Sequence, residues 1–224
     1  MSLPEPYYSA DGITVYCGDC RGMLPEMPVA DLLLTDPPYG IRYVASARGR
    51  VAGRLEGERV RGDDEPFDPR PLLGLAKRAV IFGANHFAHL LPPGGWIIWS
   101  KVQDNRWCSG GFSARSLAEV AWTNAHRHVE LYNCFWAGSP VHRQTERGLQ
   151  FHPTQKPAEL MSWIVGRTSQ PSDLVLDPYM GSGPVAVACQ LQGRRYIGIE
   201  IEERYCEIAV QRLAQGALPL EATP

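Results

Sequence analysis

The chain has 224 residues, a length that fits one domain and leaves little room for a second. Hydrophobic residues make up 44% and charged residues 21%, which excludes a disordered, collagen-like or coiled-coil chain. The 22 Lys and Arg face 24 Asp and Glu, a formal net charge of −2, so no overall positive field indicates a polyanionic partner and any contact with nucleic acid has to be local.

The first third of the chain is predicted to contain two strands and a long loop. Residues 13–17 alternate apolar with polar side chains, and residues 30–34 form a short apolar run after a proline-bounded turn. The stretch 42–70 then loses all periodicity and carries seven arginines against six acids. Loops longer than about 12 to 15 residues are usually functional lids or disordered, so we expect a mobile loop over 41–70. Its balanced charge argues against a basic DNA-binding arm.

Helices and strands then alternate along the chain. We predict helices over 71–78, 85–91, 114–123, 157–167, 185–191 and 202–213, and strands over 80–82, 95–99, 129–136, 174–176 and 196–200. Such alternation favours an α/β fold, a doubly wound, mostly parallel sheet with helices on both faces. We therefore expect a single domain over 1–224, with a less regular insertion over 101–150.

The cysteines and the apolar runs indicate the cellular compartment in which the protein is expected. Six cysteines are too few for a disulfide scaffold, and the first residues lack the pattern of a signal peptide. The longest apolar runs are far shorter than the roughly 20 residues that cross a bilayer. Cys17 and Cys20 form one pair, but no second pair follows at zinc-ligand spacing. We expect a cytoplasmic, reduced protein that uses neither a membrane nor a metal.

A glycine-rich turn over 177–183 lies between a predicted strand and a predicted helix. Gly181 and Gly183 allow a sharp turn and the close approach of a ligand. Glu200 follows Gly183 by 17 residues at the tip of the next strand, where an acid in doubly wound folds accepts hydrogen bonds from a ribose diol. A nucleoside cofactor is therefore indicated. Ala186 at the third position of the dinucleotide fingerprint leaves a nicotinamide cofactor open, whereas no P-loop element is present.

The sequence Asp36-Pro37-Pro38-Tyr39 follows the predicted strand 30–34. Taken alone it is a rigid turn, because proline fixes φ and biases the preceding residue toward extended backbone. Ligands in open parallel sheets lie beyond the carboxyl ends of the strands, however, and this turn lies at such an end. Asp36 and the carbonyl of Pro37 can both accept hydrogen bonds from an exocyclic amine on a flat base, while Tyr39 stacks on the base.

Four motifs together resemble one family, the β-class DNA amino methyltransferases that depend on S-adenosylmethionine. They are Asp36–Tyr39, His152–Pro157, Asp177–Gly183 and Gly198–Glu200, with the catalytic motif preceding the cofactor motif. Phage and prophage adenine methyltransferases are similar also at 96–101 and 119–122. The resemblance implies a Rossmann-like class I methyltransferase fold with circularly permuted motif order.

The resemblance also assigns roles to individual residues. It implies a catalytic group, Asp36, Pro37, Pro38 and Tyr39, and cofactor contacts from Asp19, Thr154, Gln155, Lys156, Asp177, Tyr179, Gly181, Ser182, Gly183 and Glu200. For Asp19 a helix N-cap is almost as good an interpretation, and for Lys156 a solvated charge is equally good. Pro184 stands where the family usually has Thr, which removes a hydroxyl and a backbone donor from the cofactor loop.

The implied activity is methyl transfer from S-adenosylmethionine to the N6 amine of an adenine flipped out of double-stranded DNA. Cytosine-N4 methylation is the first alternative, although Asp at position 36 is commoner in adenine enzymes of the family. An RNA methyltransferase, a non-catalytic cofactor-binding or DNA-binding protein and a nicotinamide-dependent oxidoreductase are further alternatives. No cysteine stands in a Pro-Cys element, so we reject carbon-5 cytosine chemistry. Residues 41–70 and 101–150 are the candidates for reading a DNA sequence. Family analogy favours a homodimer and a role in restriction-modification.

Overall fold

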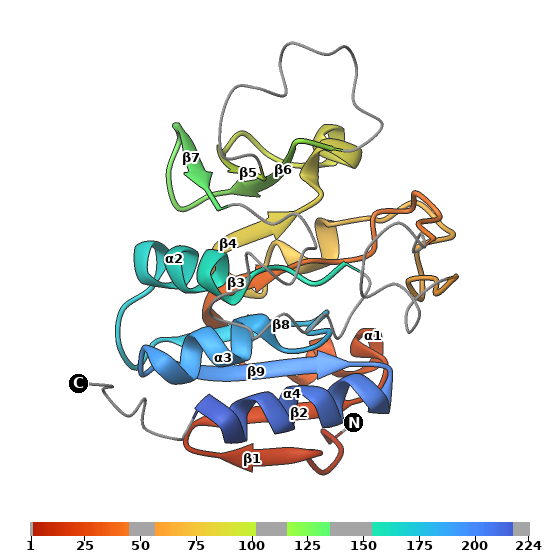
Figure 1. Cartoon of the computed structure of the whole chain (residues 1–224), viewed down its shortest axis with the longest axis vertical. Coiled ribbons are helices and arrows are strands. Elements are labelled where there is room, and N and C mark those ends of the chain that lie inside the picture. Colours follow the sequence, from red (N-terminus) through yellow and green to blue (C-terminus); the bar gives the residue numbers. More distant parts are fainter. Residues whose placement is uncertain (1, 45–56, 102–115, 135–153, 217–224) are drawn as a thin grey trace, which may run out of the picture.

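The computed structural model describes residues 2–44, 57–101, 116–134 and 154–216, and these form one nine-stranded mixed sheet. Its order is β1-β2-β9-β8-β3-β4-β6-β5-β7 (Figure 1). The strands are β1 (Tyr8–Ala10), β2 (Ile13–Cys17), β3 (Ala30–Thr35), β4 (Ala76–Phe82), β5 (Gly95–Ser100), β6 (Ala118–Thr123), β7 (Val129–Asn133), β8 (Leu174–Asp177) and β9 (Arg195–Glu200). Strands β2, β9, β8, β3 and β4 run parallel, whereas β6 is antiparallel to both of its neighbours.

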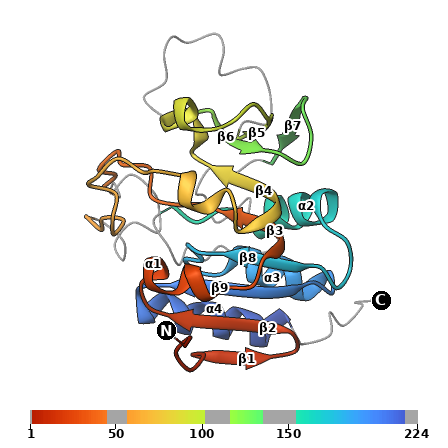
Figure 2. The same ribbon diagram turned by 180° about the vertical axis from the view of Figure 1, so that it is seen from behind.

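The two faces of the sheet are covered differently. Figure 1 shows α2, α3 and α4 on one face, and Figure 2 shows α1 and short turns on the other. The helices are α1 (Cys20–Met23), α2 (Ala158–Thr168), α3 (Pro184–Leu191) and α4 (Glu203–Gly216), and the one-turn 3-10 helices are η1 (Leu24–Glu26), η3 (Arg70–Leu72), η4 (Ala84–His86) and η5 (Ala88–Leu90). The predicted α/β class with a mostly parallel sheet is confirmed.

Central strand β3 shows how the two faces divide the core. Leu32 and Leu34 are fully buried in the cluster beneath α2, α3 and α4, whereas Leu33 points into the cluster on the opposite face. Apolar residues at consecutive positions are typical of a strand that is buried on both faces. This burial fixes the position of the turn that follows β3, and therefore the position of Asp36.

Three predicted helices are wrong. Residues 71–78 form only the turn η3 before β4 begins at Ala76, and 85–91 form the turns η4 and η5. The described part of 114–123 is strand β6, although Leu117, Ala118 and Glu119 are good helix formers. Pairing with β4 and β5 on both sides buries Ala121 and outweighs that local preference.

Parts of the predicted loop over 41–70 and of the predicted insertion over 101–150 belong to the folded body. Strands β6 and β7 lie within 101–150 and join the main sheet, and residues 60–68 lie along the site described below. The prediction of strand 129–136 holds over Val129–Asn133, while 135 and 136 lie outside the described residues. Strand β1 was not predicted. No helix in the described part of the chain is both long and apolar enough to span a bilayer.

Candidate active site

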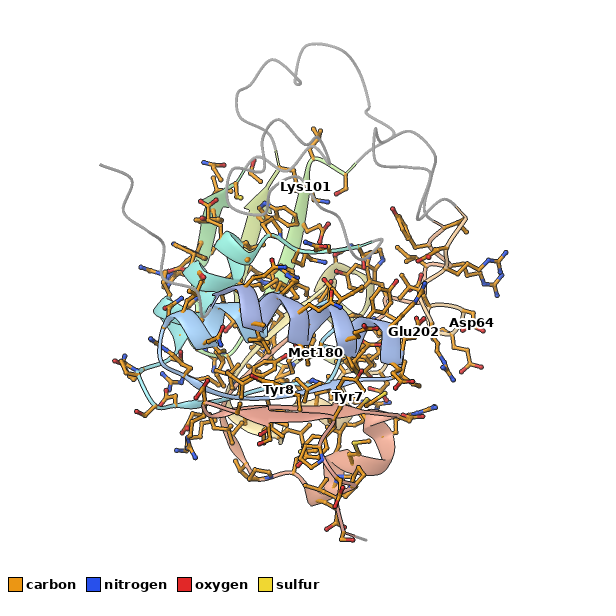
Figure 3. All side chains as sticks on the ribbon, turned by 60° about the horizontal axis from the view of Figure 1, so that its bottom comes forward. Tyr7, Tyr8, Asp64, Lys101, Met180 and Glu202 are labelled. Carbon is orange, nitrogen blue, oxygen red and sulfur yellow. The ribbon has the colours of Figure 1, made fainter. Side chains whose placement is uncertain are left out.

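A cavity of about 1630 Å³ opens at the carboxyl ends of β3, β8 and β9. Both predicted motifs line it, the turn over Asp36–Tyr39 from one side and residues 177–182 of the glycine turn from the other. Lys101, Met180 and Glu202, which are labelled in Figure 3, line the same cavity. Ligand pockets usually measure about 300 to 1000 Å³, so this one has room for a cofactor and a base together.

The turn after β3 is held by close packing around Tyr39. The Tyr39 ring stacks on His86 with the ring centroids 5.3 Å apart and the planes 19° apart. Gly83, at φ +70°, leaves space for this ring, since a Cβ there would lie 2.0 Å from a ring carbon of Tyr39. The phenol hydroxyl donates a hydrogen bond to Oδ1 of Asp36. Burial raises the pKa of Tyr39 well above its usual value, so this donor stays neutral.

Lys156 approaches Asp36 from the loop before α2. Its Nζ donates to Oδ2 of Asp36 and lies 3.3 Å from the hydroxyl of Tyr39 and 3.1 Å from Oε2 of Glu119. Lys101, after β5, donates to the other oxygen of Glu119. The side chain of Lys156 is only 4% exposed, so its interpretation as a solvated charge is wrong.

The neighbouring charges determine the protonation of Asp36 and Lys156. Burial raises the pKa of Asp36, and the ammonium of Lys156 is the largest influence that opposes the rise. Burial alone would lower the pKa of Lys156, but the carboxylates of Asp36 and Glu119 outweigh burial and raise it well above its usual value. Lys156 is therefore a permanent cation beside Asp36 at neutral pH.

Asp63 holds the backbone that follows Asp36. Its buried carboxylate accepts hydrogen bonds from the amides of Tyr39 and Gly40, both at 2.8 Å, of Ile41 at 3.3 Å and of Tyr43 at 2.6 Å. A carboxylate that satisfies several amides in this way fixes the loop. Sequence reasoning missed Asp63, because an acid within an aperiodic charged stretch carries no local signal.

We expect the substitution Asp63→Ala to lower the free energy of unfolding by about 1 to 3 kcal/mol, because buried amides lose their acceptor. Urea denaturation gives the stability, and hydrogen exchange at residues 39–43 gives the local effect. Asp64→Ala, which alters the exposed neighbouring acid, serves as the control. Unchanged exchange protection at 39–43 in Asp63→Ala would contradict this role.

The described part of the predicted loop contacts α4. The carboxylate of Glu58 accepts hydrogen bonds from Nη1 of Arg204 at 2.9 Å and from the hydroxyl of Tyr205 at 3.2 Å. Val44 and Arg59 form an isolated antiparallel bridge at the base of the loop. Residues 60–68 form one wall of the site, whereas 45–56 lie outside the described residues.

The glycine turn is fixed to the tip of β9. Gly181 and Gly183 adopt φ of +53° and +75°, as expected for glycine in a sharp turn. The amide of Gly181 donates to Oε2 of Glu200 at 2.8 Å, and the amide of Glu202 donates to Oε1 at 2.8 Å. Burial raises the pKa of Glu200, and these two amides oppose the rise. No cation pairs with Glu200 among the described residues, so its lone pairs fit the hydroxyls of a ribose.

Asp177 is buried where β8 meets the glycine turn. It accepts hydrogen bonds from the Thr35 hydroxyl at 2.8 Å, the Tyr179 amide at 3.2 Å and the Tyr196 hydroxyl at 3.4 Å. Burial raises its pKa to about 7, and the hydrogen bond from Thr35 is the largest influence that opposes the rise. A buried carboxylate that lacks a cation in the described structure fits the ammonium group of a methionine moiety.

The remaining predicted residues also reach the cavity, with the exception of Gly183, where a Cβ would lie 2.7 Å from the Cβ of Ala209 in α4. Asp19 is the N-cap of α1, accepting from the amide of Arg21 at 3.0 Å, and it is paired with the Arg21 guanidinium. Thr154, Gln155, Tyr179 and Ser182 line the cavity with Asp19. His152, quoted with the fourth motif, lies outside the described residues. Pro184 is the first residue of α3, where its missing amide costs no helical hydrogen bond.

One group of possible metal ligands lies among the described residues. Donor atoms of His126 and His128, in the turn after β6, and of Glu130, in β7, lie within 4.8 Å of one another. The carboxylate of Glu130 already accepts two hydrogen bonds from Arg167, at 2.5 and 3.2 Å. These residues do not line the cavity between the two motifs.

Comparisons with known proteins agree with this geometry. A family model described as "DNA methylase" matches residues 96–211. The Type II methyltransferase M2.MboI of Moraxella bovis is 48% identical over 93% of this chain and 90% of its own length. M.HinfI of Haemophilus influenzae, also a Type II methyltransferase, is 41% identical over 90% of this chain and 68% of its own length.

Solved structures share the fold. The cytosine-N4-specific PvuII DNA methyltransferase superposes with a TM-score of 0.63 at 15% identity, covering 97% of this chain and 90% of that chain. M1.HpyAVI in complex with S-adenosylmethionine gives a TM-score of 0.55 at 23% identity, covering 89% of this chain and 99% of that chain. The predicted Rossmann-like methyltransferase fold is confirmed.

Proposed function

Because this chain belongs to the DNA methylase family, we propose that it transfers a methyl group from S-adenosylmethionine to the N6 amine of adenine in double-stranded DNA. One observation carries the proposal. The amine-accepting turn at Asp36 and the nucleoside-binding groups Asp177 and Glu200 line a single cavity. The chain is a DNA methyltransferase that uses S-adenosylmethionine as its cofactor.

Each part of the site has a distinct task in this proposal. Bound S-adenosylmethionine would supply an electrophilic methyl carbon on a sulfonium, with a neutral thioether as the leaving group, and the proton that the amine loses would pass to solvent. Glu200 accepts hydrogen bonds from the ribose, and Asp177 pairs with the ammonium group. Asp36 and the carbonyl of Pro37 accept hydrogen bonds from the target amine, which draws its lone pair out of conjugation with the ring, while Tyr39 packs against the base. Holding both reactants in one cavity supplies much of the acceleration.

The flipped base has to be stabilised by the pocket, because extrusion from the helix costs a few kcal/mol. Residues 41–70 and 101–150 are proposed to contact the DNA and to select its sequence. Of these, residues 60–68 and 116–120 line the cavity.

We also propose that the protein forms a homodimer. The relatives M2.MboI and M.HinfI are named Type II methyltransferases, which supports methylation at a specific site.

Sequencing of genomic DNA for modified bases tests the proposed function. The protein is expressed in a host that lacks adenine methylation, with an Asp36→Ala variant as the control. We expect N6-methyladenine in one sequence context, and none with the variant. N4-methylcytosine would instead support the cytosine alternative. Unmodified DNA, together with calorimetric binding of NAD in preference to S-adenosylmethionine, would contradict the proposal.

A further inference from the structure

Four charged side chains of alternating sign form a row that ends at the proposed amine acceptor. Lys101 donates to Glu119, Glu119 lies 3.1 Å from the ammonium of Lys156, and Lys156 donates to Asp36. The side chains of Lys101 and Glu119 are each 23% exposed, and that of Lys156 is 4% exposed. The row is therefore largely shielded from water.

The topology of the sheet explains why Glu119 reaches the site. Strand β6 is antiparallel to β4 and β5, so it begins at the edge where these strands end. Glu119 is the second residue of β6 and lies opposite Trp99 of β5. Lys101, two residues after Trp99, follows the end of β5, which brings the lysine diagonally opposite Glu119.

Charge balance alone does not require Glu119. Asp36 and Lys156 already neutralise each other, yet a second carboxylate lies against Lys156 and a second lysine lies against that carboxylate. Buried charges are costly unless they are paired. In the proposed reaction, Asp36 has to accept a hydrogen bond from the target amine as well as from Lys156. A second carboxylate, that of Glu119, can hold Lys156 in place while Asp36 binds the amine.

We propose that Glu119 is a positioning residue that holds the ammonium of Lys156 beside Asp36, and that Lys101 fixes Glu119 in turn. This inference rests on the proposed function, because it assigns the row a role in presenting Asp36 to the target amine. Glu119 touches neither the base nor the cofactor in this proposal. It acts only through Lys156.

The groups around Lys156 determine how the row responds to pH. Asp36, Tyr39 and Glu119 face its ammonium, and the Phe82 ring lies 5.3 Å away. Removing the charge of Glu119 takes away one of the two carboxylates that raise the pKa of Lys156, while burial, which lowers it, remains. Lys156 should then lose its proton at a lower pH, and Asp36 should lose its cation with it.

Glu119→Gln tests this role. We expect methyl transfer to DNA to fall by roughly 10- to 100-fold, as for a misplaced reacting group. The alkaline limb of the pH profile should also move to lower pH, because one of the two carboxylates that stabilise the ammonium of Lys156 is lost. Affinity for S-adenosylmethionine, measured by calorimetry, should change less than about 2-fold. Glu119→Asp keeps the charge and should return the alkaline limb toward its wild-type position.

Further variants separate positioning from simple loss of folding. The double variant Lys101→Met/Glu119→Gln removes one cation and one anion together, so it keeps the buried charges balanced and should still shift the alkaline limb. Glu207→Gln, on the exposed side of α4, is the matched control. A uniform loss of activity with no shift of the limb in either variant would overturn the inference. Wild-type protein that methylates no DNA would instead contradict the proposed function.

Discussion

Replacement of Asp36 by alanine is expected to reduce methyl transfer by at least about 100-fold, the usual effect of removing a group that stabilises the transition state. The carboxylate of Asp36 is the charged acceptor at the end of the row, and no other carboxylate touches the hydroxyl of Tyr39 in the described structure. Transfer from labelled cofactor to DNA measures the loss. Binding of S-adenosylmethionine should persist, because Asp177 and Glu200 are unchanged.

The interpretation of this variant depends on its folding. Asp36→Ala leaves the buried ammonium of Lys156 with Glu119 as its remaining carboxylate, so a moderate loss of stability is expected. Circular dichroism and calorimetric binding of the cofactor show whether the cavity is intact. Glu207→Ala is the matched surface control. Undiminished transfer by a folded Asp36→Ala variant would remove Asp36 from its role.

The parts of the fold that were predictable are those with strong local signals. Strand β3 is a continuous apolar run, and α2 begins directly after Pro157, close to the predicted start. The turn between β8 and α3 was predictable too, because Gly181 and Gly183, between an apolar run and a helical pattern, indicate a sharp bend of the backbone. In each case the residues that determine the element are neighbours in sequence.

Strand β6 was not predictable, because its structure depends on partners elsewhere in the chain. Ala118, Glu119 and Ala121 are helix formers, and pairing with β4 and β5 makes them a strand. This error also hid part of the site. As a helical residue Glu119 had no reason to face Lys101, whereas in a strand it lies diagonally across from that lysine.

Most of the residues that line the cavity were therefore predicted, whereas the contacts between its charged side chains were not. Residues 36–39 and 177–182 meet at one cavity, as expected for turns at the carboxyl ends of parallel strands. The contact between Lys156 and Asp36 joins residues 120 positions apart, and Asp63 is separated from the Tyr39 amide by 24. Such contacts depend on tertiary packing, which hydrophobic periodicity and motif spacing do not predict.

Asp177→Asn is expected to stabilise the cofactor-free protein at pH 8 while it weakens binding of the cofactor. Burial raises the pKa of Asp177 to about 7 in the folded protein, against 3.8 for an ordinary carboxyl. The folded state therefore keeps a proton that the unfolded chain releases near pH 4, and stability falls as the pH rises from about 4 to 7. Asparagine cannot ionise, so the variant should be more stable at pH 8 by roughly 2 to 4 kcal/mol and similar to wild type at pH 4.

The negative charge of Asp177 lowers the stability of the cofactor-free protein but is useful for binding the cofactor. If Asp177 pairs with the ammonium of S-adenosylmethionine, binding restores a partner to the buried carboxylate, and Asp177→Asn should bind the cofactor about 10- to 100-fold more weakly. Chemical denaturation at pH 4 and pH 8, with calorimetry at pH 8, measures both effects. Thr35→Val removes the hydrogen-bond donor that opposes the rise in the pKa of Asp177, so this variant should be less stable than wild type at pH 8. A variant Asp177→Asn that is less stable at pH 8, or that binds the cofactor as tightly as wild type, would show that the carboxylate serves the fold and not the ligand.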